Sequence, residues 1–232
     1  MKRFLDDENN IITECETVDE FINEYYVNEA EFLNLKASDD LYKEIYETVK
    51  ENPKYQLLHA EFYAYGKVVE ENNIKFFDML KELVDKKDKR ATCYLGVAYF
   101  NGDGIDKDEK LGIKLITKAA DLGYSLADYE LCIYYANHYA ISKLAKCKAK
   151  LKEKGTPRAK YNLAMSFSEV GSYLDAFPYM LSAAKAGFDE AMYYVALMYK
   201  DGKGTKKSQK DYEMWMNKAK KLGNPRALLE TE

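Results

Sequence analysis

The sequence predicts an all-α solenoid of antiparallel helix pairs, and two observations carry this prediction. The first is an alanine that recurs at intervals of 36, 32, 32 and 36 residues, at Ala91, Ala127, Ala159, Ala191 and Ala227. The second is a glycine four residues before the last four of these alanines, with Lys87 in that place before the first, at Gly123, Gly155, Gly187 and Gly223. Self-similarity at such a period is typical of helical repeats, in which each unit buries its apolar face only by stacking on its neighbours.

Residues 1–53 are predicted to form an acidic helical cap ahead of the repeats. Its first helix begins at the capping-box pattern of residues 17–20, a threonine followed three residues later by a glutamate, and its apolar face holds Phe21, Ile22, Tyr25, Phe32 and Leu33. A second helix starts after Ser38 and stops before Pro53, which cannot continue it. Residues 1–52 contain fifteen acidic and five basic residues, a net charge of −10, so the rest of a chain whose total is −4 carries +6.

The recurring alanines set the boundaries of the repeats. The best-preserved unit spans 91–126, and small residues on both of its helices allow them to approach closely. Asp106 or Asp108 is expected to cap the second helix of this unit, and the terminal glycines suit left-handed helix ends. The other predicted units are a degenerate repeat at 54–90, two repeats with shortened turns at 127–158 and 159–190, a repeat at 191–226 and a truncated terminal helix at 227–232.

One pattern within these units resembles a known family. Residues 91–104 read Ala-x-x-x-Leu-Gly-x-x-Tyr-x-x-Gly-x-Gly and residues 118–123 close the unit with Lys-Ala-Ala-x-x-Gly, which resembles the Sel-one-like repeat, a relative of the tetratricopeptide repeat. The turn at 171–176 looks more like the tetratricopeptide variant, and Gly112 replaces an expected alanine. The resemblance covers about residues 91–227. It implies a right-handed superhelix whose first helices line a concave face, and a role as an adaptor or scaffold for other proteins.

No catalytic residues, cofactor or metal ligands are predicted. The two histidines, His59 and His138, have no cysteine or carboxylate at zinc-site spacing, so surface or packing roles are expected. The acids between 103 and 109 have the wrong spacing for an EF-hand loop, and the Gly-x-Gly turns lack the preceding strand and third glycine of a dinucleotide site. Some secreted relatives of the resembled family carry cysteine pairs and are linked to β-lactam or peptidoglycan chemistry, and this chain has no such paired spacing.

The location expected from the sequence is the cytoplasm. No stretch reaches the roughly 20 apolar residues that cross a bilayer, and the first residues lack a signal-peptide core, so no membrane partner is expected. Without short paired spacings, the cysteines are expected to be reduced, and they are Cys15, Cys93, Cys132 and Cys147.

A row of lysines raises the question of nucleic-acid binding. Six lie within twelve residues, at Lys143, Lys146, Lys148, Lys150, Lys152 and Lys154. Clustered lysines can neutralise phosphates, but the whole chain is acidic and no arginine or aromatic residue interleaves the row. A solvated outer helix is the favoured interpretation, and no nucleic-acid partner is expected.

The candidate binding surface is a ladder of equivalent positions on successive first helices. If the helix pairs stack as the resemblance implies, the ladder lines a groove whose aromatic members are typical interface anchors. Packing of the same rings against the neighbouring repeat is the competing interpretation. The predicted groove residues are Cys93, Val97, Phe100, Tyr129, Ile133, Tyr161, Met165, Tyr193 and Leu197.

The function predicted from these features is non-catalytic binding of a protein or peptide in the groove, as an adaptor or scaffold. A first alternative is a cytosolic inhibitor or immunity protein that neutralises a toxin or effector enzyme, with the acidic segment helping to dock a basic partner. A second alternative, a hydrolase of peptidoglycan or β-lactams, rests on family analogy alone. The short last helix leaves one end of the solenoid poorly capped, which would allow two chains to pair there.

Overall fold

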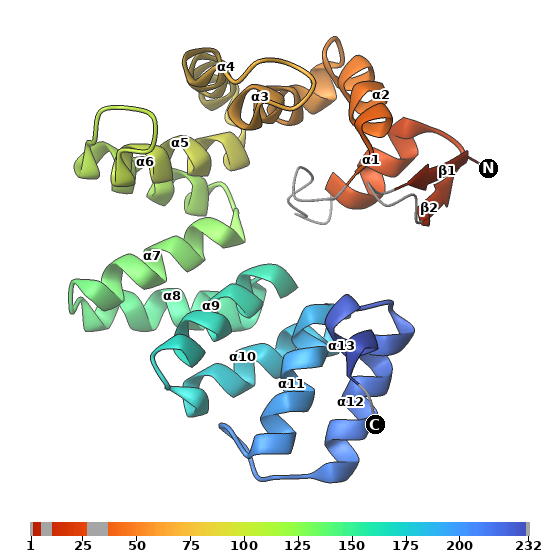
Figure 1. The fold of residues 1–232 in the computed structure, drawn as a ribbon. Coiled ribbons are helices and arrows are strands. Elements are labelled where there is room, and N and C mark those ends of the chain that lie inside the picture. Colours follow the sequence, from red (N-terminus) through yellow and green to blue (C-terminus); the bar gives the residue numbers. More distant parts are fainter. Residues whose placement is uncertain (1, 6–10, 27–36, 231–232) are drawn as a thin grey trace. The chain divides into compact units, whose positions relative to one another are not determined.

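The computed structural model describes residues 2–5, 11–26 and 37–230, and it divides into two compact units, residues 1–122 and 123–232 (Figure 1). Each unit is a stack of helix pairs, so the fold is an all-α repeat. Unit 1 contains β1 (Lys2–Leu5), β2 (Ile11–Cys15), α1 (Val18–Tyr26), α2 (Asp39–Val49), the 3₁₀ turn η2 (Pro53–Tyr55), α3 (Gln56–Tyr65), α4 (Asn73–Asp85), α5 (Lys89–Asn101) and α6 (Glu109–Asp121). Unit 2 contains α7 (Ser125–Asn137), α8 (Ile141–Lys154), α9 (Pro157–Glu169), α10 (Tyr173–Lys185), α11 (Asp189–Asp201), α12 (Gln209–Lys221) and α13 (Pro225–Leu229).

The N-terminal segment departs from the sequence prediction, because it begins with a β-hairpin rather than with helices alone. Strands β1 and β2 pair antiparallel, with Lys2 opposite Cys15 and Arg3 opposite Glu14. The run Ile-Ile-Thr in β2 is β-branched, and such residues favour strands over helices. The predicted positions Phe32 and Leu33 lie outside the described residues.

Helices α1 and α2 begin where the sequence predicted, and both starts use side-chain caps. The Thr17 hydroxyl accepts a hydrogen bond from the Glu20 backbone N–H at 3.1 Å, and the Glu20 carboxylate accepts one from the Glu16 backbone N–H at 2.7 Å. The hydroxyl of Ser38, at the N-cap of α2, accepts from the Leu41 N–H at 3.3 Å. These bonds satisfy backbone donors that a helix start otherwise leaves unpaired.

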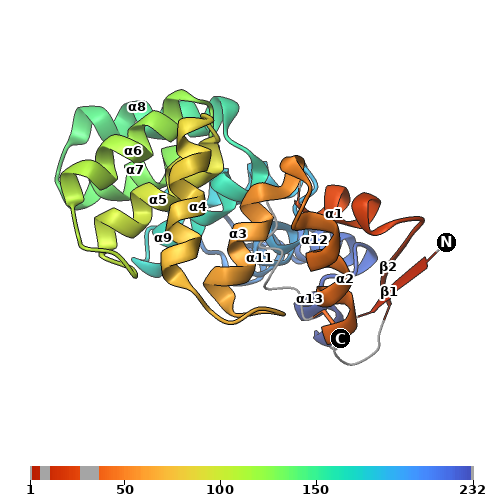
Figure 2. The same cartoon turned by 90° about the horizontal axis from the view of Figure 1, so that it is seen from above.

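The helices of unit 1 that follow form two antiparallel pairs. Helices α3 and α4 lie side by side, as do α5 and α6 (Figure 2). Asp108 caps α6 by accepting from the Leu111 N–H at 2.9 Å. The core between these pairs consists of buried aliphatic and aromatic side chains, Leu57, Phe77, Leu80, Leu83, Ala91, Leu95 and Ala98.

In unit 2 the pairs are α7 with α8, α9 with α10, and α11 with α12, and α13 packs on α12 (Figure 1). The recurring alanines Ala127, Ala159, Ala191 and Ala227 are all fully buried, which explains why nothing larger stands at these places. The largest core cluster of this unit surrounds Trp215 and draws side chains from α9 through α13.

The residues that end the second helices confirm three of the four glycine predictions. Gly123, Gly187 and Gly223 have φ values of 81°, 96° and 79°, in the left-handed region that suits glycine. The prediction for Gly155 is wrong. Helix α8 ends directly before Gly155, whereas α6, α10 and α12 each end two positions before their glycine. The Gly155 backbone is extended, with φ of −64° and ψ of 141°. Lys87 stands where the later repeats have glycine, and its backbone adopts the same left-handed conformation, with φ of 62°.

Candidate functional site

Every position of the predicted ladder but one is partly buried, with a minor part of the side chain exposed. Cys93 is only 3% exposed, so its side chain is part of the core and does not reach a surface. In unit 1 the remaining ladder residues are Val97 and Phe100 on α5. In unit 2, α7, α9 and α11 each contribute a tyrosine and an aliphatic or methionine residue one turn later, namely Tyr129, Ile133, Tyr161, Met165, Tyr193 and Leu197.

The ladder tyrosines of unit 2 each contact the repeat that follows in the chain. The Tyr129 hydroxyl lies 3.2 Å from the Ser166 hydroxyl on α9. The Tyr161 ring lies 5.1 Å from the ring of Phe188, at the start of the next repeat. The Tyr193 hydroxyl donates to the Glu230 carboxylate at 3.2 Å. Part of each tyrosine side chain therefore packs against the next repeat, and the rest is exposed.

A cavity of about 290 Å³ opens beside Tyr161 in unit 2. It lies where the first residues of α9 and α11 and of the short α13 converge. Its lining combines two arginines, one glutamate and two aromatic rings with smaller polar groups, and the residues are Arg158, Tyr161, Asn162, Phe188, Glu190, Asn224, Pro225 and Arg226. An aromatic wall with a few converging charged groups is the usual composition of a binding pocket.

The three charged residues of this cavity occupy one position of the repeat. Arg158, Glu190 and Arg226 each stand directly before a recurring alanine, so stacking of the repeats brings them into a row. Sequence analysis did not identify them, because a charged residue at the start of a helix looks like an ordinary surface residue. The signal that could have found them is the alternation of charge at a single repeat position.

The electrostatics of the cavity centre on Glu190. Burial, followed by a hydrogen bond with Asp189 and the charge of that neighbour, raises the pKa of Glu190 to about 7, while Arg158 acts in the opposite direction. Asp189 itself accepts a hydrogen bond from the Asn224 amide at 2.9 Å. Burial also raises the pKa of the Tyr161 phenol, to about 12, so this tyrosine is neutral at physiological pH.

Arg226 is fixed at the edge of the cavity by Tyr194. One of its terminal nitrogens donates to the Tyr194 hydroxyl, and its guanidinium carbon lies 5.6 Å from the centre of the same ring. A guanidinium has five N–H donors in a planar fork, so this contact orients the group without using most of its donors.

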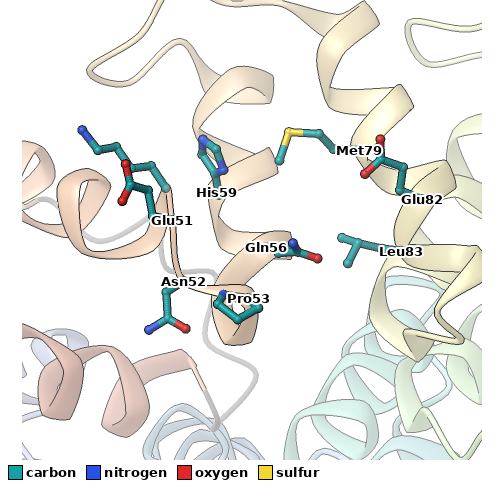
Figure 3. Close-up of a pocket in the computed structure, with 9 residues that line it drawn as sticks. Glu51, Asn52, Pro53, Gln56, His59, Met79, Glu82 and Leu83 are labelled. Atoms are coloured by element: carbon teal, nitrogen blue, oxygen red, sulfur yellow. The ribbon is translucent and has the colours of Figure 1, made fainter.

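Unit 1 has a smaller pocket of about 120 Å³. Figure 3 shows His59 and Gln56 on α3 between the Glu51–Pro53 segment and the side chains of Met79, Glu82 and Leu83 on α4. The Nε2 atom of His59 is buried without a hydrogen-bond partner, and the imidazole packs 5.6 Å from the Tyr46 ring. Burial lowers the pKa of His59, which favours the neutral imidazole.

The lysine row lies on α8, and several of its members contact unit 2 itself. Lys150 forms a 2.7 Å ion pair with the buried carboxylate of Asp128 on α7. Lys148 lies 3.6 Å from the Asp175 carboxylate and 4.4 Å from the centre of the Phe167 ring. Part of the row therefore stabilises the helix packing rather than forming a continuous exposed basic face.

Two cysteines of unit 2 meet although their spacing in the sequence gave no sign of it. Cys132 on α7 and Cys147 on α8 share a hydrogen bond, which raises the pKa of the Cys132 thiol and lowers that of Cys147. Facing positions on paired helices, rather than a short sequence spacing, bring them together.

Residues 2–5, 11–26 and 37–230 contain neither a membrane-spanning helix nor a metal-binding cluster. No described helix combines the length and the apolar character needed to cross a bilayer. Within the same ranges, no three histidine, cysteine, aspartate or glutamate side chains converge as they would around a metal ion.

Comparison with known proteins identifies the repeat. The sequence model of the Sel1 repeat matches residues 89–124 and 189–224, which correspond to α5–α6 and α11–α12. No curated protein sequence matches the chain.

Three solved structures of similar fold are covered by this chain over most of their length. A Sel1 repeat protein from Oxalobacter formigenes superposes with a TM-score of 0.59 at 20% identity, covering 91% of this chain and 87% of that one. The immunity protein Pa5087 from Pseudomonas aeruginosa gives a TM-score of 0.60 at 16% identity, covering 95% and 88%. The immunity protein PA5088 from the same organism gives 0.54 at 18% identity, covering 95% and 87%. At these identities the likeness is one of fold.

Proposed function

The chain contains Sel1 repeats, and from this premise we propose that it is a non-catalytic module that binds another protein. The binding surface is the exposed part of the ladder on α9 and α11, together with the adjoining cavity of unit 2. The observation that carries the proposal is the row of partly buried tyrosines at one repeat position beside a cavity with an aromatic and charged lining. Large, rigid aromatic side chains of this kind lose little entropy on binding and are common interface hot spots.

The more specific proposal is that the bound protein is an effector enzyme or toxin, which the chain inhibits as an immunity protein. Two of the structures that match nearly the whole chain are described as immunity proteins. The net charge of −10 on residues 1–52 supports the same proposal, because an acidic segment would attract a basic enzyme. On α2, Asp39, Asp40 and Glu47 are exposed, and Asp40 and Glu47 form ion pairs with Lys43 and Lys50 on the same helix.

A hydrolase is not proposed, because no observation favours it. The residues that line the unit 2 cavity include no serine, cysteine or histidine, so that cavity offers none of these nucleophiles or bases. A fold shared with other repeat proteins does not supply a catalytic site.

The test compares two triple variants of the tagged full-length chain in capture experiments from its native cells. The surface variant carries Tyr161→Ala, Tyr193→Ala and Leu197→Ala. The matched control carries Tyr139→Ala, Ile141→Ala and Leu174→Ala. These remove three exposed apolar side chains of the same unit, 89%, 78% and 83% exposed, from the turn before α8 and from the first residues of α8 and α10. We expect the wild type and the control to retain one protein that mass spectrometry identifies and the surface variant to lose it, with all three chains melting cooperatively.

The immunity function is tested by expressing the captured protein in a sensitive strain. We expect growth to stop and to be restored by the wild-type chain but not by the surface variant. Equal capture by both triple variants would reject the binding surface. A captured protein that leaves growth unaffected would reject immunity and leave the adaptor role.

A further inference from the structure

Resting on the proposed function, we propose that the cavity of unit 2 receives an acidic side chain of the partner protein, and that Glu190 takes up a proton as this carboxylate docks. The proposal names both the chemistry of the partner group and a pH dependence of binding. It goes beyond protein binding as such, which the ladder alone would allow.

The arrangement of charges in the cavity selects an anion. Arg158 and Arg226 stand on either side of Glu190 in the order of the repeats, so the lining carries two permanent positive charges and one group that titrates. Arginine forms planar, two-point hydrogen bonds with carboxylates, which makes it the preferred partner for such a group at interfaces. Tyr161 and Phe188 supply apolar walls that strengthen these bonds by excluding water.

The size of the cavity suits one side chain. Its volume of about 290 Å³ is at the lower limit of small-molecule pockets. The neighbouring exposed faces of Tyr193 and Leu197 would then hold the adjacent part of the partner.

Glu190 is the group that would otherwise oppose an anion. The groups that face it are Arg158 on α9, its neighbour Asp189 on α11, the phenols of Tyr161 and Tyr194, and Arg226 at α13. Asp189 is held by the Asn224 amide, and both phenols contact arginine or aromatic neighbours. Since the pKa of Glu190 is about 7, its carboxyl is partly protonated at neutral pH, and protonation removes the negative charge that would repel an incoming carboxylate.

The direction of the pH dependence follows from linkage. A bound carboxylate raises the pKa of Glu190 further, because the two like charges repel, so docking and protonation favour each other. Affinity therefore rises as the pH falls from 8 through 7 to 6. A cationic side chain would give the opposite dependence, because it would bind the ionised form of Glu190.

The test uses isotope-labelled full-length chain and the α-methylamide of N-acetyl-glutamate as the probe, so that the side-chain carboxylate is the only one the probe carries. The α-methylamides of N-acetyl-glutamine and N-acetyl-lysine serve for comparison. The NMR signals of the arginine Nε–H groups report on the cavity. We expect the glutamate probe alone to shift the signals of Arg158 and Arg226 saturably, with an affinity about fivefold greater at pH 6 than at pH 8. The probe's own carboxyl group titrates near pH 4.3, outside this window.

Three variants separate the parts of the proposal. Glu190→Gln should keep the binding and lose its pH dependence, and Arg158→Gln with Arg226→Gln should lose the binding. Lys203→Gln removes a charge elsewhere in unit 2, where Lys203 pairs with Asp201 at 3.0 Å, and should change neither. The absence of any saturable shift, an equal response to the lysine compound, or a pH dependence that survives in Glu190→Gln would overturn the proposal.

The outcome is distinguishable from failure of the proposed function. Capture of the partner that depends on Tyr161, Tyr193 and Leu197 but is unaffected by the double variant Arg158→Gln with Arg226→Gln would reject the carboxylate site and leave protein binding intact. Saturable binding of the glutamate probe, together with partner capture that is unaffected by substitution of the tyrosines, would reject the proposed protein-binding surface and leave the carboxylate site intact.

Discussion

At the scale of single residues, the repeat imposes a backbone conformation that its sequence satisfies in two ways. The residue four positions before a recurring alanine is left-handed at Gly123, Gly187 and Gly223, and also at Lys87, with φ of 62°. A side chain in this conformation costs about 1–2 kcal/mol because its Cβ approaches the following carbonyl oxygen. Lys87 therefore carries strain that the equivalent glycines avoid.

This strain predicts opposite effects for two reciprocal substitutions. Lys87→Gly should raise the free energy of unfolding by about 0.5–1 kcal/mol, since relief of strain exceeds the entropy that glycine adds to the unfolded chain. Gly123→Ala should lower it by about 1 kcal/mol for conformational reasons alone, because no other atom lies within 4 Å of the added Cβ. Urea unfolding measures both values.

The control for Lys87→Gly is Lys86→Gly, where φ is −77° and no strain is relieved. This substitution should be neutral or destabilising. Equal stabilisation by the two glycines would contradict the explanation, since the benefit would then come from losing a lysine.

The functional residues were less predictable than the backbone, for a physical reason. Tyr129, Tyr161 and Tyr193 recur at one repeat position, so their shared surface could be predicted before the structure. Arg158, Glu190 and Arg226 also share a position, but alternating charges carry no hydrophobic period, and only the stacked helices show that they line one cavity.

At the scale of elements, the α5–α6 pair depends on two glycines that face each other. A Cβ on Gly112 would lie 2.7 Å from the Phe100 nitrogen, and one on Gly96 would lie 2.9 Å from the Ile116 nitrogen. These are backbone atoms, so the helices could accommodate a methyl group only by separating. In the repeat at 191–226 the place of Gly96 is taken by Ala196, which is fully buried.

This difference predicts that the two small residues cannot be exchanged. Gly96→Ala should lower the free energy of unfolding by about 2 kcal/mol, although alanine favours helices, because it overpacks the crossing of α5 and α6. Ala196→Gly should lower it by about 1 kcal/mol, because it removes a buried methyl group and a helix-favouring residue. Stabilisation by Gly96→Ala in urea unfolding would show that the crossing has room for a side chain.

Elements were predicted well wherever the hydrophobic period was long, and poorly at short segments. The helix starts at Ser38 and Asp108 follow from capping side chains, which act locally. The β1–β2 hairpin was missed because strands of four and five residues are too short to show a hydrophobic period. The Gly155 backbone was missed because α8 continues one residue beyond the repeat pattern.

At the scale of the whole molecule, charge is distributed unevenly along the chain. Residues 1–52 carry −10 and residues 53–232 carry +6. Charge of this kind acts over a Debye length of roughly 8–10 Å at physiological salt, so it affects the encounter with a partner more than the final contacts. The proposed basic effector would be attracted by the acidic segment, while the cavity of unit 2 would bind one of its carboxylates.

This division of roles predicts how salt and mutation affect the two rate constants. Raising sodium chloride from 50 to 500 mM should lower the association rate of the chain and its captured partner about tenfold and leave the dissociation rate nearly unchanged. The variant with Asp39→Asn, Asp40→Asn and Glu47→Gln should associate more slowly at 50 mM and respond less to salt. Stopped-flow fluorescence measures both rate constants.

A matched variant with Glu153→Gln, Glu169→Gln and Glu213→Gln removes three exposed acids of unit 2 and should retain most of the wild-type rate. If both variants slow association equally, total charge rather than the acidic N-terminal segment attracts the partner, and a rate that rises with salt would mean that the partner is acidic.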